Sequence, residues 1–424
     1  MTMIYALILF AVTYVLMLTF TKYRPYIALG SAVVFIATGM LPFDQIFGAI
    51  DWNVLLMIAG TMGLVQLFID SRMPARLADM IMLKVPNVQM AAVALALFAG
   101  IISAFVDNVA TVLMVAPVAL AICKKLKTNP VPFIIGIAVS SNLQGAATLV
   151  GDTTAIMLGS YADMSFLDFF WYKGRPGIFF AVELGAIASA LILAWLFRKE
   201  KDSIEQRGEL TPVTDYVPTV LLVGMIALLI SASFIPVKPD ITNGLICVSL
   251  FIIGMVYTFA RTRSADAFLG PIKSIDFETI GLLFGLFLVI GGITNMGVVD
   301  AAAGLLARMG GGNVFVIYTV IVWASVLFSA FIDNIPYVPT MLPVVTGLAS
   351  TLGIDPTLLY FGLLSGATLG GNCTPIGASA NITGIGILRR EGYEVKTGDF
   401  CRIGIPFTLA AVIPAYIYFW LLYA

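Results

Sequence analysis

The sequence predicts an all-α integral membrane protein made of two inverted-topology repeats, and two observations support this fold class. Hydrophobic residues make up 60% of the chain and charged residues 11%, whereas soluble domains have about 45–50% and about 25%. The segment 103–108, SAFVDN, returns as SAFIDN at 329–334. The same offset gives four further identical pairs: Pro117 with Pro343, Gly145 with Gly371, Thr148 with Thr374 and Gly151 with Gly377.

Apolar runs of about 20 residues, the length that crosses a hydrocarbon core of about 30 Å, occur in the same order in both repeats. Repeat 1, residues 1–200, has spans near 3–20, 26–42, 53–70 and 177–197, a hairpin at 88–122 and a broken helix at 132–160. Repeat 2, residues 216–424, has spans near 216–234, 241–259, 278–296 and 403–423, a hairpin at 313–349 and a broken helix at 357–387. Residues 201–215 form a polar cytoplasmic linker of mixed charge.

The hairpin stretches are too long for one span and carry polar residues in the middle, so we expect each to enter and leave on one side. Five crossings per repeat remain, and an odd number inverts the second repeat. With both termini outside the cytoplasm, 19 of the 23 basic residues fall in cytoplasmic loops, where Lys and Arg collect. The two hairpin tips then approach each other from opposite faces. The N-terminal run lacks a basic n-region and a clear cleavage site, so we interpret it as a retained first span in the inner (plasma) membrane.

Composition also excludes several classes of function. A net charge of −1 gives no basis for nucleic-acid binding. The four cysteines lack a CxxC spacing, which favours neither a disulfide framework nor a thiolate metal site. The absence of histidine excludes imidazole ligands and His proton relays, so proton chemistry must use carboxylates. No P-loop pattern supports ATP drive. We expect no cofactor other than bound sodium ions.

Each hairpin has an Asp-Asn pair at its predicted tip, Asp107-Asn108 and Asp333-Asn334. A carboxylate near the bilayer centre costs about 2.5–3.5 kcal/mol, which favours a functional role. The alternative is that each Asp caps a half-helix by accepting backbone N–H bonds, and both roles can coexist. The asparagines offer neutral oxygens for sodium, while half-helix N-termini offer partial positive charge to an anion.

The broken stretches 142–154 and 368–381 concentrate Gly, Asn, Thr and Pro. Unwound backbone is tolerated at membrane depth only where it lines a cavity. The alternative, close helix packing through small residues, does not need Asp152 or Asn372. Because Asp152 aligns with Ala378, we expect two unequal halves of one site. The candidate substrate- or ion-binding residues are Ser103, Asp107, Asn108, Thr111, Asn142, Gly145, Thr148, Gly151, Asp152, Thr153, Ser329, Asp333, Asn334, Thr368, Gly371, Asn372, Thr374, Gly377, Ser379 and Asn381.

Three acidic residues lie outside the hairpin tips and the broken stretches. Glu183 lies inside a predicted span, where it either pairs or relays protons, or simply reaches water. Asp51 and Asp276 precede matching helices and are expected to be N-caps.

The tip motif SAFVDNVATV with Pro117, the segment 142–152 and the segment 370–381 resemble the ion transporter superfamily. Within it, the chain is most similar to the citrate-transporter-like branch that holds arsenite efflux permeases, sodium–proton antiporters and the melanosomal P protein, over nearly its whole length. The resemblance implies a homodimer with a scaffold part and a mobile transport part that moves as an elevator. It also implies sodium or substrate ligands at Asn108, Thr148, Asn334 and Thr374. Divalent-anion symporters of the superfamily carry a neutral Ser-Asn-Thr at the tips, whereas this chain has Asp-Asn.

These features favour a secondary active transporter coupled to sodium or protons, which exchanges the two or exports a small inorganic solute such as arsenite. The alternative is a sodium-driven symporter of an anion, either a di- or tricarboxylate or an inorganic oxyanion. No arginine lies at either site in the sequence, which argues against a multiply charged anion. An intramembrane aspartyl protease is disfavoured, because the Asp pair sits in repeats with broken helices; we expect no enzyme activity.

Overall fold

The computed structural model describes residues 3–126, 128–199 and 210–424, which are almost entirely helical and confirm the predicted class. The one sheet in this part of the chain is a two-stranded antiparallel hairpin of β1 (Trp171–Tyr172) and β2 (Arg175–Pro176). The helices of the first half are α1 (Met3–Thr19), α2 (Arg24–Ala37), α3 (Ile46–Ala49), α4 (Trp52–Asp70), α5 (Met73–Met82), α6 (Val88–Ser103), α7 (Asn108–Leu126), α8 (Val131–Gly145), α9 (Thr153–Tyr161) and α10 (Ile178–Leu196).

The second half follows the same order of elements. Its helices are α11 (Val217–Ser233), α12 (Thr242–Thr262), α13 (Ala265–Lys273), α14 (Phe277–Asn295), α15 (Val298–Met309), α16 (Val314–Ser329), α17 (Asn334–Leu352), α18 (Thr357–Gly370), α19 (Ser379–Arg390) and α20 (Thr397–Tyr423). The contacts repeat as well. Helix α4 packs on α12 as α2 packs on α14, and α6 packs on α8 as α16 packs on α18.

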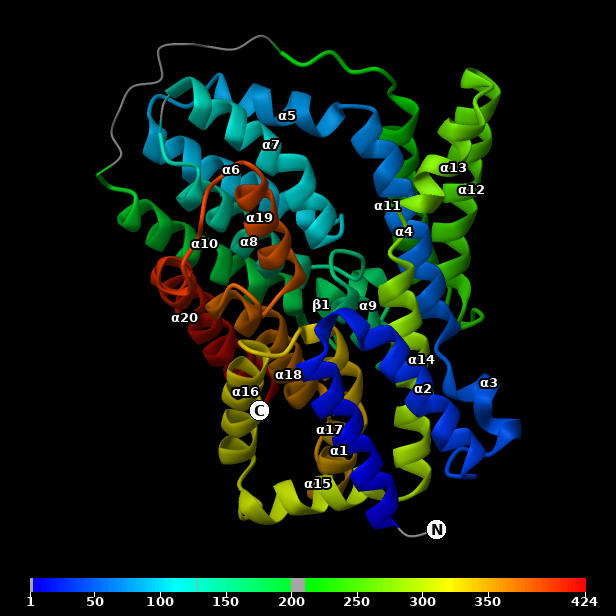
Figure 1. Cartoon of the computed structure of the whole chain (residues 1–424). Helices are drawn as coiled ribbons and strands as arrows, with labels where there is room; N and C mark the ends of the chain where they lie inside the picture. The colour runs from blue at the N-terminus through cyan, green and yellow to red at the C-terminus, as the bar shows by residue number, and fades with distance from the viewer. Residues whose placement is uncertain (1–2, 127, 200–209) are drawn as a thin grey trace.

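Two groups of helices stand side by side in Figure 1, one around α2, α4, α12 and α14 and the other around α6, α8, α18 and α20. Helix α10 packs along α20, so the ends of the two halves meet. Helices α5 and α15 lie across the opposite ends of the molecule in Figure 1. Neither helix could be recognised in the sequence as a span, because both are too short to cross a bilayer.

Seven helices within the described residues are long and apolar enough to cross a membrane. The number rises to nine if each of two bent pairs counts as one span: α1 with α2, bent by 117°, and α15 with α16, bent by 118°. The expected arrangement of ten crossings, the repeat boundaries and the sides from which the hairpins enter stay predictions.

The helix interruptions fall inside the predicted hairpins and broken helices. Helix α6 ends at Ser103 and α7 begins at Asn108. The matching break in the second half lies between Ser329, the end of α16, and Asn334, the start of α17. The chain likewise leaves the helical conformation between α8 and α9 and between α18 and α19. Each interruption frees backbone N–H and C=O groups next to the candidate residues.

The structure confirms the predicted N-capping roles of two acidic residues outside the hairpin tips and broken stretches. Asp51 caps α4 by accepting from the Val54 N–H at 3.0 Å, and Asp276 caps α14 by accepting from the Thr279 N–H at 3.0 Å. Glu183 is half-buried on α10 and has no hydrogen bond or ion pair with any residue that the structure describes.

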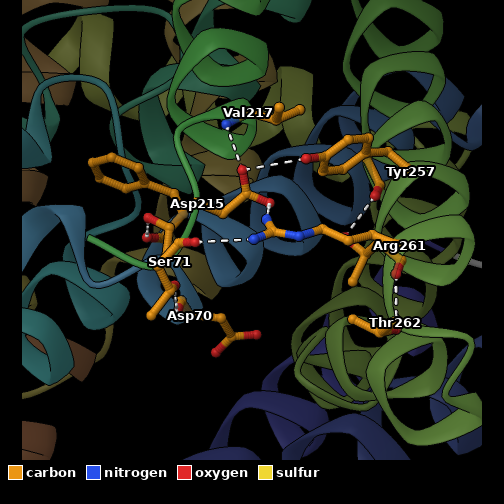
Figure 2. Close-up of polar contacts among 11 residues, drawn as sticks. Asp70, Ser71, Asp215, Val217, Tyr257, Arg261 and Thr262 are labelled. Carbon is orange, nitrogen blue, oxygen red and sulfur yellow. Dashed lines mark hydrogen bonds and ion pairs between the residues drawn. The ribbon is translucent and has the colours of Figure 1, made fainter. Parts of the chain in front are cut away.

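The predicted linker 201–215 lies partly outside the described residues. Its last residues are held between the α4–α5 turn and α12, rather than forming an ordinary solvated loop (Figure 2). Asp215 forms an ion pair with Arg261 and accepts a hydrogen bond from the Tyr257 hydroxyl at 3.4 Å. The Thr214 N–H donates to the Ser71 carbonyl at 3.0 Å. These bonds fix the point at which the second half of the chain begins.

Candidate functional site

A chain of buried amides joins the two halves at the centre of the molecule. The Asn108 Nδ2 donates to Asn142 Oδ1 at 3.0 Å and to Asp152 Oδ1 at 3.1 Å. The Asn142 Nδ2 donates in turn to the Thr368 carbonyl at 2.6 Å and to Asn372 Oδ1 at 3.1 Å. One hairpin tip and both broken helices are therefore tied together by side chains that sequence analysis selected separately.

Asp107 performs the capping role and also faces a small cavity. Its Oδ1 accepts from the N–H groups of Val109 and Ala110 at 3.0 and 3.1 Å. A cavity of about 10 Å³ lies between Asp107 and Asp152, with Thr61 of α4 and Thr153 also in its wall. That volume is about what one water molecule needs. No basic side chain lines this cavity among the described residues.

The Asp152 carboxylate is buried and accepts hydrogen bonds from two side chains. Besides Asn108, the Thr154 hydroxyl donates to its Oδ2, and Thr154 also exchanges a 2.9 Å hydrogen bond with Thr368 of the other half. Asp152 itself is 3% exposed. An acidic group this deeply buried is kept in place by its neutral donors, and the cavity side of the carboxyl is where a cation or proton can reach it.

Asp333 has a different environment, and it corrects one sequence interpretation. The Arg24 guanidinium lies 3.5 Å from Asp333 Oδ2, so an arginine does lie at one of the two sites. Asp333 also accepts from the Ser379 hydroxyl at 2.9 Å and from the Ile335 N–H at 3.3 Å. The sequence interpretation failed because Arg24 is 309 positions away in the chain and comes close only in the fold, where α2 packs on α14 and α14 contacts α17.

The second half also leaves polar atoms without partners. The Asn334 Nδ2 and the Asn381 Oδ1 are buried and have no hydrogen-bond partner in the part of the chain that the structure describes. Asn108, which matches Asn334, donates to two acceptors, Asn142 and Asp152. The second half has Thr368 and Ala378 at the positions of these two acceptors. The two halves therefore differ in their hydrogen bonds: among the described residues, the second has an open donor on Asn334 and an open acceptor on Asn381, and the first has an open acceptor on Gln144. That these are two halves of one site stays a prediction.

The predicted sodium ligands Thr148 and Thr374 make the same bond in both halves. Each hydroxyl donates to a carbonyl at its hairpin tip, that of Ala104 for Thr148 and that of Ala330 for Thr374. These bonds join each broken helix to its hairpin. A role in sodium binding stays a prediction, and the described residues contain no group of three or more His, Cys, Asp or Glu side chains that could hold a metal ion.

The other candidates lie at the same centre and mostly serve its packing. Ser103 accepts from the Ser141 hydroxyl at 3.1 Å, and the Ser329 hydroxyl donates to the Ala367 carbonyl. Thr111 is fully buried on α7. The glycines allow close approach of backbones: Gly145 with Gly151, and Gly371 with Gly377.

A wide cleft of about 1780 Å³ opens beside this centre. Its wall is formed by residues in the ranges 41–56, 157–168, 233–243, 287–295 and 339–343. Five aspartates and one lysine, Lys238, belong to this wall. We call this space the open cleft.

The site residues that were not among the candidates from the sequence include Thr61, Thr154 and Arg24. Thr61 is a single hydroxyl among the apolar and small residues in the middle of α4 and gave no signal. Arg24 did have one: Arg24-Pro25 matches Lys238-Pro239 at an offset of 214 residues, which repeats a basic-Pro pair in the two halves.

The comparison with known proteins decides the family. The model of the family described as citrate transporter matches residues 14–364 and 245–424. The chain belongs to the citrate transporter family. It is thus a membrane transporter, as expected, and this family assignment also agrees with the expectation that it is not an enzyme.

Relatives within and beyond bacteria support the assignment to the citrate transporter family. The uncharacterized transporter Rv2685 of Mycobacterium tuberculosis is 29% identical over 442 residues, covering 99% of both chains. The human P protein is 28% identical over 387 residues, which is 74% of this chain and 46% of the P protein. Among solved structures, the YdaH transporter of Alcanivorax borkumensis has a similar fold, with a TM-score of 0.62 at 14% identity over 95% of this chain and 97% of that one.

We expect Cys373→Ser to transport at the normal rate, within about twofold. Cys373 lies between α18 and α19, close to Thr374, but serine keeps its size and the proposed chemistry needs no thiolate. Initial flux rates of the two proteins at equal reconstitution density test this. A selective loss of arsenite flux in Cys373→Ser would instead indicate a thiolate contact to the metalloid.

Proposed function

We propose that this protein is a secondary active transporter coupled to sodium or protons, with the Asp107–Asp152 cavity as its coupling site. The observation that carries the proposal is a pair of carboxyl groups facing a cavity the size of one water molecule, with no basic residue in its wall. Such a space fits one small cation or the protons that replace it. The solute is then exchanged for the cation or exported with it, as for a small inorganic solute such as arsenite.

The physical basis for coupling is competition at the carboxyl groups. Burial favours the neutral carboxylic acid, and a nearby cation favours the carboxylate. A site with two carboxyls that are desolvated together therefore binds either protons or a cation, but not both fully. Asn108 strengthens this competition, since it links the tip to Asp152 and moves with the hairpin.

Alternating access of the elevator type is part of this proposal, with a scaffold part and a transport part that carries both hairpins and both broken helices. The matching order of elements in the two halves supports it. So does the open cleft, whose wall includes residues of α4, α9, α14 and α17. We further propose a homodimer in the plasma membrane with both termini outside the cytoplasm.

A second candidate is a sodium-driven symporter of an anion, a di- or tricarboxylate or an oxyanion. Arg24 favours it, because a guanidinium beside the second tip is a cationic partner for a desolvated anion. The description of the family as citrate transporters points the same way. The ion pair with Asp333 argues against an anion symporter, because this carboxylate already neutralises the Arg24 guanidinium.

Sodium binding to the purified protein tests the coupling site directly. We expect calorimetric titration to show sodium binding that weakens as the pH falls, because protons compete for the same carboxyls. Asp152→Asn should weaken the affinity at least tenfold, which corresponds to about 1.4 kcal/mol. The matched control is Asp276→Asn, an exposed capping residue outside the site, which should bind like the unmodified protein. Equal affinity in Asp152→Asn and the control would contradict the assignment.

A further inference from the structure

Two connections occupy matching positions in the halves. We call them elbow 1 (residues 20–25, the connection after α1 with the first two residues of α2) and elbow 2 (residues 234–241, between α11 and α12). The offset of 214 residues that pairs Arg24-Pro25 with Lys238-Pro239 also pairs Ile27 with Ile241 and Gly30 with Gly244. Both cations bond to the end of the preceding helix. The Arg24 Nε donates to the Met17 carbonyl at 3.2 Å, and the Lys238 Nζ donates to the Ala232 carbonyl at 3.0 Å.

Elbow 1 holds the tip of the second hairpin. Arg24 pairs with Asp333 at 3.5 Å, and both side chains are largely buried, at 16% and 7% exposure. In the preceding helix α1, the Tyr14 hydroxyl donates to the Pro336 carbonyl at 2.7 Å and also bonds to Thr340. Elbow 1 therefore contacts the tip, and α1 before it contacts the first turns of α17.

Elbow 2 has no corresponding ion pair with the tip of the first hairpin among the described residues. Lys238 lines the open cleft, and among the described residues it forms no ion pair. Asp107, the residue that matches Asp333, accepts only from backbone N–H groups in the part of the chain that the structure describes, and it does not belong to the cleft wall. Elbow 1 is thus in contact with the tip of the second hairpin through Arg24, whereas Lys238 of elbow 2 has no ion pair with Asp107 at the tip of the first hairpin.

We propose that Arg24 and Lys238 are reciprocal ion-pairing residues of the transport cycle. The Arg24–Asp333 pair stabilises the conformation seen here, and a Lys238–Asp107 pair stabilises the opposite one, in which the open cleft is closed. This inference rests on the alternating access of the proposed function. When two inverted repeats exchange their conformations, a contact present in one half appears in the other and is lost from the first.

The chemistry of the second pair gives it a role beyond holding a conformation. An ammonium group that reaches Asp107 competes with a sodium ion or proton for the same carboxylate. Lys238 would thus promote release of the coupling cation as the cleft closes. Arg24 does the equivalent at Asp333, which explains why one tip carries a basic partner while the other is free.

The test is the accessibility of a single cysteine in the open cleft. Thr294 on α14 is exposed and belongs to the cleft wall. In a Thr294→Cys protein whose four native cysteines are replaced by serine or alanine, the rate of labelling by a polar maleimide reports the open conformation. Arg24→Gln should slow labelling roughly threefold or more, because it weakens the pair that stabilises that conformation. Lys238→Gln should speed labelling, since it weakens the opposite conformation.

Two further variants keep the test decisive. Lys22→Gln, an exposed cation of elbow 1 without an ion pair among the described residues, should leave the rate unchanged. Tyr14→Phe removes the polar contacts between α1 and the start of α17 and should slow labelling like Arg24→Gln, which covers the case that Arg24→Gln does not fold. Shifts in the same direction for Arg24→Gln (or Tyr14→Phe) and Lys238→Gln, or no shift in either, would overturn the proposal.

The labelling experiment is independent of ion coupling. Opposite shifts together with sodium-independent flux would leave the reciprocal pairs standing and overturn the proposed coupling. Sodium-driven flux with parallel or absent shifts would do the reverse.

Discussion

Asp107→Asn is expected to abolish cation-driven transport while leaving the protein folded. Asparagine is as good an N-cap as aspartate, so the bonds from Val109 and Ala110 to this side chain can persist. What the substitution removes is the negative charge and the exchangeable proton at the cavity shared with Asp152. Initial flux in proteoliposomes should fall by at least about 100-fold, the scale of losing one of two charged partners of a desolvated ion.

The controls for this substitution separate charge from structure. Asp276→Asn changes a matching helix cap that lies outside the site and should keep normal flux. Size-exclusion chromatography should give the same elution volume, and thermal unfolding the same unfolding temperature, for the unmodified protein, Asp107→Asn and Asp276→Asn. Asp333→Asn should also abolish transport, because it leaves the Arg24 guanidinium without its partner. Normal flux in both tip variants would contradict a coupling role for the tips.

Gly151→Ala is expected to have the second large effect, through packing instead of charge. A methyl group at Gly151 would lie 2.5 Å from the Ser103 carbonyl oxygen and 2.6 Å from that of Gly145. These are backbone atoms at the hairpin tip and the end of α8, so neither can move without displacing Asp152. Overpacking of this kind costs about 1–3 kcal/mol. We expect a lower unfolding temperature and a loss of most transport activity.

A glycine in open space provides the matched control. Gly386 lies in α19, and a methyl group there meets no atom within 4 Å. Gly386→Ala should therefore stabilise the protein slightly, by about 1 kcal/mol at most, because alanine favours the helix. Equal unfolding temperatures and fluxes for the two variants would show that the contact at Gly151 does not matter.

Local signals predicted the broken elements well. The interruptions at 103–108 and 329–334 could be located because an acidic residue is rare inside an apolar segment. Those within 142–154 and 368–381 could be located from their concentration of Gly, Asn and Thr. The caps at Asp51 and Asp276 were equally visible, since a capping residue acts within three positions of itself. The amide chain from Asn108 to Asn142 and Asn372 could be anticipated only as a set of residues, not as a set of bonds.

The features that the sequence did not show depend on contacts between distant segments. Arg24 looked like any loop residue until α2 was placed beside the tip of the second hairpin. Thr61 faces the small cavity only because α4 packs near the α8–α9 interruption. The open donor on Asn334 results from the absence of acceptors in its surroundings, which no single position encodes.

The most direct test of the account is proton flux in proteoliposomes that contain only this protein, after a jump in sodium concentration at fixed membrane potential and without an organic anion. The account predicts proton movement opposite to sodium that is lost in Asp107→Asn and kept in Asp276→Asn. Proton flux that is absent without an added solute, or that is unchanged in Asp107→Asn, would contradict cation exchange at the Asp107–Asp152 cavity.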